Sequence, residues 1–488
     1  MEERKGFGTN FGFLMAAVGS AVGLGNIWGF PNKMGASGGF TFLVIYLVLA
    51  VLCGFIVMVG ELALGRKTRH GAVGAYKALS KKFKWMGWLG ILSAFFILFF
   101  YCALGGYCIK YTVLNIGDLF HAGFGANALA ETAAANGNSL GAEVFGAFMS
   151  SPTEAIIYGL IFVAITMIIV LGGIGGGIEK VCSVGMPALF VMLLICIIRA
   201  CTLEGAVDGL KYMFVPGWAV TNGVIDKAPN FFGVLSAAGG QMFFSLSLGM
   251  GIMITYGSYL DKKENLQKNA LLIIIMDTLV ALMAGLCVIP GRFALDPTGS
   301  LGGPKLLFVT MQNVFSRMGP IGPIFGILFY LLVVFAAISS SISLLEAVVA
   351  HFVDNARDAG KGDKRKAYAL IAAVAVGVGA MLICADSLGE ASFTPWRLLN
   401  LPAESIRTWN DCWLDFFDML SEGIMMPLGA LMMTLMVGWE LGPDVVKDEC
   451  EASGHAMASY GFYKVCIKYI TPLCMILVLY GQIKEFFF

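Results

Sequence analysis

The chain has 488 residues, of which 58% are hydrophobic and only 13% are charged, and its 32 basic residues balance its 32 acidic residues. Soluble globular proteins have about one-quarter charged residues. The composition therefore excludes an ordinary soluble protein and predicts a protein that crosses a membrane many times.

Eleven segments are apolar over about the 20 residues that a bilayer-spanning helix needs. They are 11–36, 40–64, 88–116, 153–172, 180–200, 232–259, 268–290, 320–350, 366–385, 412–438 and 460–483. Residues 1–488 are expected to form one transmembrane domain. The first five helices (11–200) and the next five (232–438) have a similar rhythm, and because five is odd the second set crosses in the opposite sense. The predicted fold class is an all-α integral membrane protein with a 5+5 inverted repeat and one additional helix at 460–483.

Basic side chains gather in some connecting segments and are missing from others. Lysines and arginines occur throughout 66–84 and return at 262–268 and 357–366, whereas 115–151 contains neither. Positive residues stay in the cytoplasm, so we expect a cell-membrane protein with a cytoplasmic N-terminus and with 115–151 outside. The basic runs then mark topology, and nucleic acid is not an expected partner.

The first apolar segment contains residues that a lipid-facing helix avoids. From Gly19 it reads GSAVGLGNIWGFP, with four glycines and Asn26. Each interior glycine loses about 1 kcal/mol of helix propensity relative to alanine, and a break survives in a bilayer only where it lines a cavity walled by protein. Such a break would free the carbonyls of Gly19, Ala21 and Val22 for a cation. Close helix packing through glycines four apart explains the same pattern equally well.

Polar residues inside later apolar segments complete the pattern. An interruption, SLSLGMG, begins at Ser245 in the sixth segment, and two broken helices in corresponding places indicate a mid-membrane substrate site in a secondary transporter. Ser339 and Ser340 can reach a cation beside the Ala336 carbonyl, although helical serines also bond to the preceding turn. Asp277 lies within the seventh segment, where a carboxylate needs a cation or a proton.

Residue patterns for enzymatic chemistry are missing from the sequence. The 12 cysteines and four histidines are scattered singly, without metal or redox spacing, and there is no phosphate loop or nucleophile elbow. We therefore expect neither an enzyme nor a transporter that hydrolyses ATP on this chain.

Three motifs resemble those of one transporter family. GSAVGLGN followed by FP, QMFFSLSLGMG and AAISSSISLLE, at the observed separations, are similar to the neurotransmitter:sodium symporter family in its bacterial amino-acid-transporting branch. The resemblance extends from Arg4 to about Trp439. It implies a leucine-transporter-like fold, alternating access, two sodium sites and one amino-acid site.

The resemblance also assigns site residues. One sodium site is expected to use Gly19, Val22, Ala336, Ser339 and Ser340, and the other Ala21, Asn26, Ser245, Asp277 and the substrate carboxylate. The expected substrate-binding residues are Ala21, Gly25, Ile97, Tyr101, Phe244, Ser247, Gly249, Ser341 and Leu344. Among them, Tyr101 is expected to hydrogen-bond the substrate carboxylate and Phe244 to close over it. The run Gly249-Met250-Gly251 resembles members that accept bulky side chains.

The gate residues implied by the resemblance depart from the family at two positions, the outer-gate arginine and the inner-gate tryptophan, which is Phe7 here. The gate residues are Arg4, Phe7, Tyr259 and Asp354 on the inner side and Asp418 on the outer side. The family's outer-gate arginine is replaced by Gly29. Lys33, Arg397 and Arg407 are the candidate partners for Asp418.

The resemblance also bears on the ions and the substrate. Where the animal branch binds chloride, this chain has Ala281 in place of a serine and the acid Asp277, whose charge replaces that of chloride. The sequence thus predicts a chloride-independent sodium symporter of neutral, bulky hydrophobic or aromatic L-amino acids, with the amino acid and the lipid bilayer as partners. A sensor of the same fold, which Gly29 favours, and an amine or osmolyte symporter remain as alternatives. The sequence predicts no oligomeric state.

Overall fold

The computed structural model describes residues 7–297, 303–361, 364–399 and 410–487, and all regular secondary structure in them is helical. Nine of these helices are long and apolar enough to cross a membrane, and a bent pair, α1 (Asn10–Ala21) with Gly25–Ala36, makes a tenth. Two shorter helices, α13 (Phe231–Ser245) and α14 (Ile252–Gly257), follow one another across a six-residue break. The predicted all-α membrane fold is confirmed.

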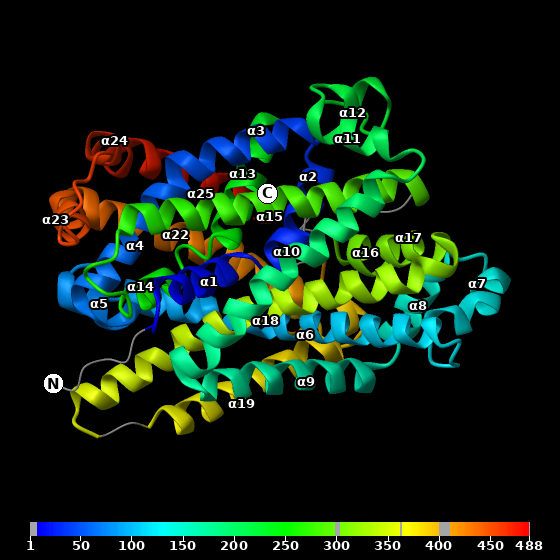
Figure 1. Cartoon of the computed structure of the whole chain (residues 1–488), viewed down its shortest axis with the longest axis horizontal. Helices are drawn as coiled ribbons and strands as arrows, with labels where there is room; N and C mark the ends of the chain where they lie inside the picture. The colour runs from blue at the N-terminus through cyan, green and yellow to red at the C-terminus, as the bar shows by residue number, and fades with distance from the viewer. Residues whose placement is uncertain (1–6, 298–302, 362–363, 400–409, 488) are drawn as a thin grey trace.

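Most spans consist of one or two α-helices, several of them joined by a π-helical turn (Figure 1). They are α2 (Phe30–Ala36), α3 (Phe40–Leu49), α4 (Phe55–Thr68), α6 (Met86–Leu119), α9 (Pro152–Leu171), α10 (Lys180–Cys201), α15 (Leu266–Leu295), α18 (Gly322–Asp358), α19 (Arg365–Asp386), α21 (Trp413–Asp418), α22 (Met426–Leu435) and α25 (Thr471–Phe487). The π-helical turns are η1 (Gly25–Gly29), η2 (Ala50–Gly54), η4 (Ile174–Glu179), η5 (Leu306–Thr310), η9 (Met419–Met425), η10 (Met436–Glu440) and η11 (Cys466–Ile470).

Short helices lie in the connections. They are α5 (Ala72–Leu79), α7 (Ala130–Asn136), α8 (Leu140–Met149), α11 (Ala206–Phe214), α12 (Trp218–Thr221), α16 (Gly303–Lys305), α17 (Met311–Arg317), α20 (Pro395–Leu398), α23 (Asp444–Glu451) and α24 (Tyr460–Val465), with 3-10 turns η3 (Ala126–Leu129), η6 (Gly319–Ile321) and η7 (Ser387–Gly389). Helix α5, in the lysine-rich connection, lies at the end of the molecule near the N-terminus, and α7, in the connection without basic residues, lies at the opposite end (Figure 1). The two connections therefore lie at opposite ends of the molecule, and their assignment to the two sides of the membrane stays a prediction.

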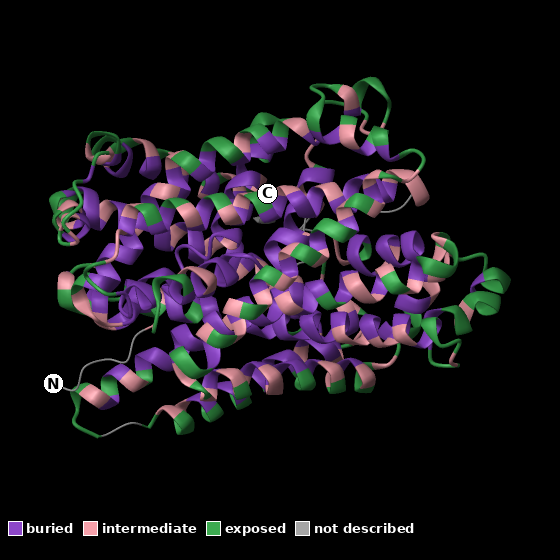
Figure 2. Cartoon of the chain, in the orientation of Figure 1, coloured by how far each residue is buried: buried purple, intermediate pink, exposed green. Residues whose placement is uncertain are grey.

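The broken helices lie inside the bundle. Helix α1 packs against α10, α15 and α18, and α14 packs against α4, while α6 runs along α18 and α9. Buried residues dominate this interior, whereas exposed residues concentrate on the outer helices and at the ends (Figure 2). Apolar side chains such as Val184, Ile198 and Ile371 are exposed on the outer faces of α10 and α19, as expected for surfaces that contact lipid.

A testable consequence concerns the close contact between α4 and α14. A Cβ atom built on Gly65 would lie 1.9 Å from the backbone oxygen of Ile254, so the two helices have no room for a methyl group there. We predict that Gly65→Ala lowers the free energy of unfolding by about 1–3 kcal/mol because of overpacking. The measurement is the Tm of the purified protein in detergent. Gly146→Ala is the control, since nothing lies within 4 Å of its added Cβ; an equal loss in both variants would contradict the prediction.

Candidate functional site

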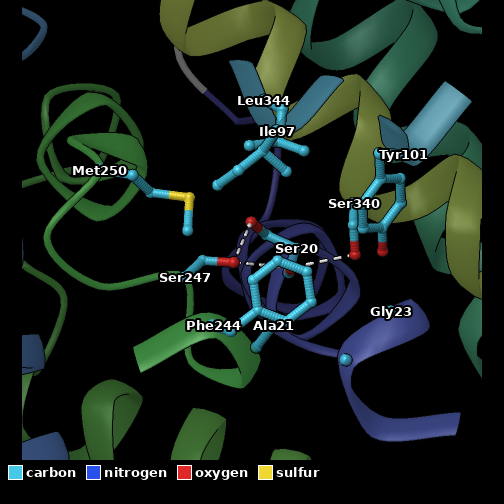
Figure 3. Close-up of a pocket in the computed structure, with 11 residues that line it drawn as sticks. Ser20, Ala21, Gly23, Ile97, Tyr101, Phe244, Ser247, Met250, Ser340 and Leu344 are labelled. Carbon is cyan, nitrogen blue, oxygen red and sulfur yellow. Dashed lines mark hydrogen bonds between the residues drawn. The ribbon is translucent and has the colours of Figure 1, made fainter. Parts of the chain in front are cut away.

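A small cavity lies where the two broken helices meet (Figure 3). Its lining residues come from α1, η1 and the break between them, from α13 and the α13–α14 break, and from α6 and α18. They are Ser20, Ala21, Gly23, Gly25, Ile97, Tyr101, Phe244, Ser247, Met250, Ser340 and Leu344. Seven of the nine residues expected to bind substrate are thus brought together in one cavity.

The other two expected substrate residues, Gly249 and Ser341, do not line this cavity. The Gly249 N–H donates to Glu61 Oε1 at 2.8 Å, and a Cβ there would lie 2.3 Å from the Met426 backbone oxygen. Ser341 Oγ instead shares a 2.8 Å hydrogen bond with Thr166 Oγ1 of α9. Both residues therefore contact neighbouring helices and not the cavity.

Met250 is a cavity residue that the sequence motif contains but that was not among the expected substrate residues. Its side chain extends toward the cavity from the break between α13 and α14 (Figure 3). The flanking Gly249 and Gly251 have φ angles of +78° and +75°, a backbone conformation that favours glycine. A long apolar residue between two glycines was the sequence feature that could have identified Met250 as a cavity residue.

The Asn26 side chain accepts a backbone hydrogen bond at the break in the first span. Its Oδ1 accepts the Gly23 N–H at 2.9 Å, which satisfies a donor freed by the break. Its Nδ2 donates to Asp277 Oδ1 at 2.7 Å and approaches Ser245 Oγ at 2.9 Å. Ser245 Oγ donates to Asp277 Oδ1 at 2.9 Å, and the Tyr46 hydroxyl donates to Asp277 Oδ2 at 3.2 Å. Three residues expected at one sodium site, Asn26, Ser245 and Asp277, thus form one buried cluster whose hydrogen bonds to the carboxylate come from neutral groups.

A second group of oxygens lies between the end of α1 and the middle of α18. Ser339 Oγ is 3.3 Å from the Val22 carbonyl and 2.9 Å from the Ala336 carbonyl. Ser340 Oγ is 3.3 Å from the Gly19 carbonyl and 3.4 Å from that of Val22. All five residues expected at the other sodium site therefore meet, and their hydroxyl and carbonyl oxygens suit a hard cation.

Tyr101 and Phe244 both line the cavity, and their rings are neighbours. The Tyr101 hydroxyl accepts the Leu24 N–H at 2.8 Å, at the start of the second half of the broken first span. The Phe244 ring lies 6.4 Å from the Tyr101 ring, centroid to centroid. Gln241 Nε2 donates to the Gly25 carbonyl at 2.7 Å and so links the two broken spans beside the cavity.

The expected inner-gate residues pack around the start of α1. The Phe7 ring lies edge-on to Tyr256 and Tyr259, with centroid separations of 5.7 and 6.2 Å. The Tyr259 hydroxyl donates to Glu346 at 2.7 Å, and Asp354 accepts the Gly71 N–H at 2.8 Å. Arg4 lies outside the described residues.

An ion pair near the expected outer gate lies at a different place from the expected one. Asp418 ends α21, but Lys33, one of its three candidate partners, forms an ion pair with Glu422. Arg397 is exposed on α20, and Arg407 lies outside the described residues.

Fold and site together define a class of protein: a helical secondary transporter with two broken helices around a central cavity and two groups of oxygen atoms beside it. Comparison with known proteins identifies the family. Residues 4–121 and 152–394 match the model of the sodium:neurotransmitter symporter family. A sodium-dependent transporter of Bacillus subtilis, YhdH, is 31% identical over 485 residues, which cover 96% of each chain. A sodium-dependent transporter of Haemophilus influenzae is 29% identical, with 98% of each chain covered.

A solved structure agrees with these relatives. MhsT in complex with L-phenylalanine superimposes with a TM-score of 0.82 at 32% sequence identity, over 98% of this chain and 100% of that one. The chain belongs to the sodium:neurotransmitter symporter family and has its leucine-transporter-like fold. It is accordingly a sodium-dependent secondary transporter of a small molecule, located in a membrane, and not an enzyme.

A second prediction follows from the contact between Tyr101 and the break. Tyr101→Phe leaves the buried Leu24 N–H without its acceptor, so we expect a loss of about 1–3 kcal/mol in the free energy of unfolding. The measurement is the Tm in detergent without added substrate. Tyr111→Phe, on the same helix, is the control because the Tyr111 hydroxyl has no hydrogen-bond partner in the part of the chain that the structure describes. A Tm unchanged in Tyr101→Phe would show that this bond contributes nothing to stability.

Proposed function

We propose that the protein is a sodium-coupled symporter that takes up neutral, bulky hydrophobic or aromatic L-amino acids by alternating access, without a need for chloride. The observation that carries this proposal is the convergence of the cavity, the Asp277 cluster and the serine–carbonyl group on the two broken helices. The structural likeness to MhsT, solved with L-phenylalanine, supports the same substrate class.

The cavity offers a complementary group to each part of an amino acid. Its carboxylate would bind at the N-terminus of the half-helix that follows Leu24, where the helix dipole favours an anion, and would accept a hydrogen bond from the Tyr101 hydroxyl. Carbonyls freed in the α13–α14 break would accept from the ammonium group. The side chain would lie among Ile97, Phe244 and Leu344. Met250, with its flexible thioether, can adapt to bulky side chains of different shape.

Sodium would bind at the two oxygen groups. One ion would take the carbonyls of Gly19, Val22 and Ala336 with the hydroxyls of Ser339 and Ser340. The other would take the Ala21 carbonyl, Asn26, Ser245, Asp277 and the substrate carboxylate. Because the substrate then completes an ion site, binding of one favours binding of the other. Each sodium ion that enters releases about 2.3 kcal/mol per 100 mV of membrane potential, so one or two ions suffice for accumulation.

Orientation and gating complete the proposal. The protein would lie in the cell membrane with a cytoplasmic N-terminus, the repeats 11–200 and 232–438 moving against each other. Release inward would require separation of the Phe7 and Tyr259 contacts, together with the gate residues Arg4 and Asp354. A sensor without transport is the weaker alternative, because it has no use for two groups of cation ligands. A symporter of amines or osmolytes would be expected to have an acid near Ala21, and this chain has none between Ala21 and Gly25.

The proposal predicts concentrative uptake in a defined system. Purified protein in proteoliposomes should accumulate one or more labelled apolar or aromatic L-amino acids under an inward sodium gradient, and not when potassium replaces sodium. A panel of labelled neutral amino acids, with glycine betaine and γ-aminobutyrate as competitors, identifies the substrate. Sodium-dependent binding without accumulation would favour the sensor, and competition by the amines alone would contradict the amino-acid assignment.

Chloride independence has its own test. The Asp277 carboxylate provides a negative charge beside the expected sodium ion, so uptake should be the same in chloride and in gluconate. In Asp277→Asn that charge is lost, and uptake should fall at least about tenfold or become chloride-stimulated, since one uncompensated buried charge outweighs 1.4 kcal/mol. Asp208→Asn, at an exposed position on α11, is the matched control. Full chloride-free uptake by Asp277→Asn would refute this role.

A further inference from the structure

An ion pair joins two spans on the outer side of the cavity. Lys33, on α2, pairs with Glu422, in the π-helical turn η9. The Glu422 side chain is only 9% exposed and that of Lys33 is 25% exposed. Charges removed from water to this extent are strongly destabilised when their partner is lost, so the pair holds α2 against η9.

The pair lies next to the link between the broken helices. Gln241 donates to the Gly25 carbonyl, and Gly25 lines the cavity. The neighbouring Gly240 faces the ion pair, because a Cβ built on it would lie 3.2 Å from Glu422 Oε1. Lys33 follows Gly25 by eight residues, or about 12 Å along a helix, toward the end of the molecule that carries α7.

The side chain of Gln241 fills the space beside Gly29, the position one helical turn before Lys33. A Cβ on Gly29 would lie 2.8 Å from Gln241 Oε1, so the space beside it is occupied by the amide that links the two broken spans. Lys33 comes one helical turn after Gly29, and Glu422 comes one turn after Asp418. Lys33 also has a favourable electrostatic interaction with Asp418. Lys33 therefore lies near two carboxylates, those of Asp418 and Glu422, and it forms its ion pair with Glu422.

We propose that the Lys33–Glu422 ion pair is the outer gate of this transporter. It closes the path to the cavity by holding the outer half of the first span to the tenth, and it separates when substrate enters. The inference deepens the proposed function and rests on it only for which end of the molecule faces outward. Glu422, and not Asp418, is the carboxylate whose contact with Lys33 keeps the cavity closed.

Accessibility of the cavity to a thiol reagent tests the gate without any substrate. Ile97→Cys places a thiol in the cavity lining, and a membrane-impermeant methanethiosulfonate reaches it in intact cells only from outside. The measured quantity is the rate at which the reagent modifies this thiol in sodium-free potassium buffer. The rate for the parent chain, which has only its natural cysteines, is subtracted as background. Adding Lys33→Gln or Glu422→Gln should raise this rate about tenfold, the size of a moderate conformational bias. The reversed pair, Lys33→Glu with Glu422→Lys, should restore the slow rate.

Matched variants separate the gate from general damage. Lys211→Gln removes an exposed ion pair with Asp208 on α11 and should leave the rate unchanged. Asp418→Asn should raise it less than Glu422→Gln does. Lys33→Arg keeps the charge and should keep the slow rate, and gel filtration shows which variants are folded.

Two results would overturn the proposal: unchanged rates in both neutralised variants, or a larger effect of Asp418→Asn than of Glu422→Gln. Because the assay contains neither sodium nor amino acid, its outcome is independent of the uptake panel. A failed uptake panel with the predicted rates would leave the gate standing and remove only the proposed substrate.

Discussion

The free backbone groups of two broken helices are the constraint on which the site depends. A bilayer offers no water to an exposed N–H or carbonyl, so every group released by a break must find a partner within the protein. Four side chains from four different spans do this here. Asn26 accepts from Gly23, Tyr101 accepts from Leu24, Gln241 donates to Gly25 and Glu61 accepts from Gly249.

The same partners connect the breaks to the rest of the bundle. Asn26 bonds both to its own break and to Asp277 on α15, so a ligand that moves the first span also moves the carboxylate cluster. Ser339 and Ser340 bond to carbonyls of α1 from the middle of α18. A cation that takes these oxygens replaces hydrogen bonds that hold the two spans together, and this exchange gives ion binding a means to change their relative position.

Much of the site was predictable because the membrane makes polar residues in apolar helices conspicuous. Glycines, Asn26, Asp277 and the serines of α18 stand out against their apolar neighbours, and the structure brings them together. Gly249 and Ser341 show where such reasoning stops. A motif places a residue on the correct helix, but the direction of its side chain depends on the rotation of that helix, which turned Ser341 toward Thr166 of α9.

The sequence by itself determined the membrane class, the broken helices, the residues expected to bind cations and the family, since each depends on residue type and spacing along one chain. Tertiary structure alone decided that Met250 lines the cavity and that Lys33 pairs with Glu422 and not with the expected Asp418. The two residues of that ion pair are 389 positions apart. The charge of Lys33 limits its ion-pair partners to acids. Helix packing then decides which of two acids, one helical turn apart, lies within reach.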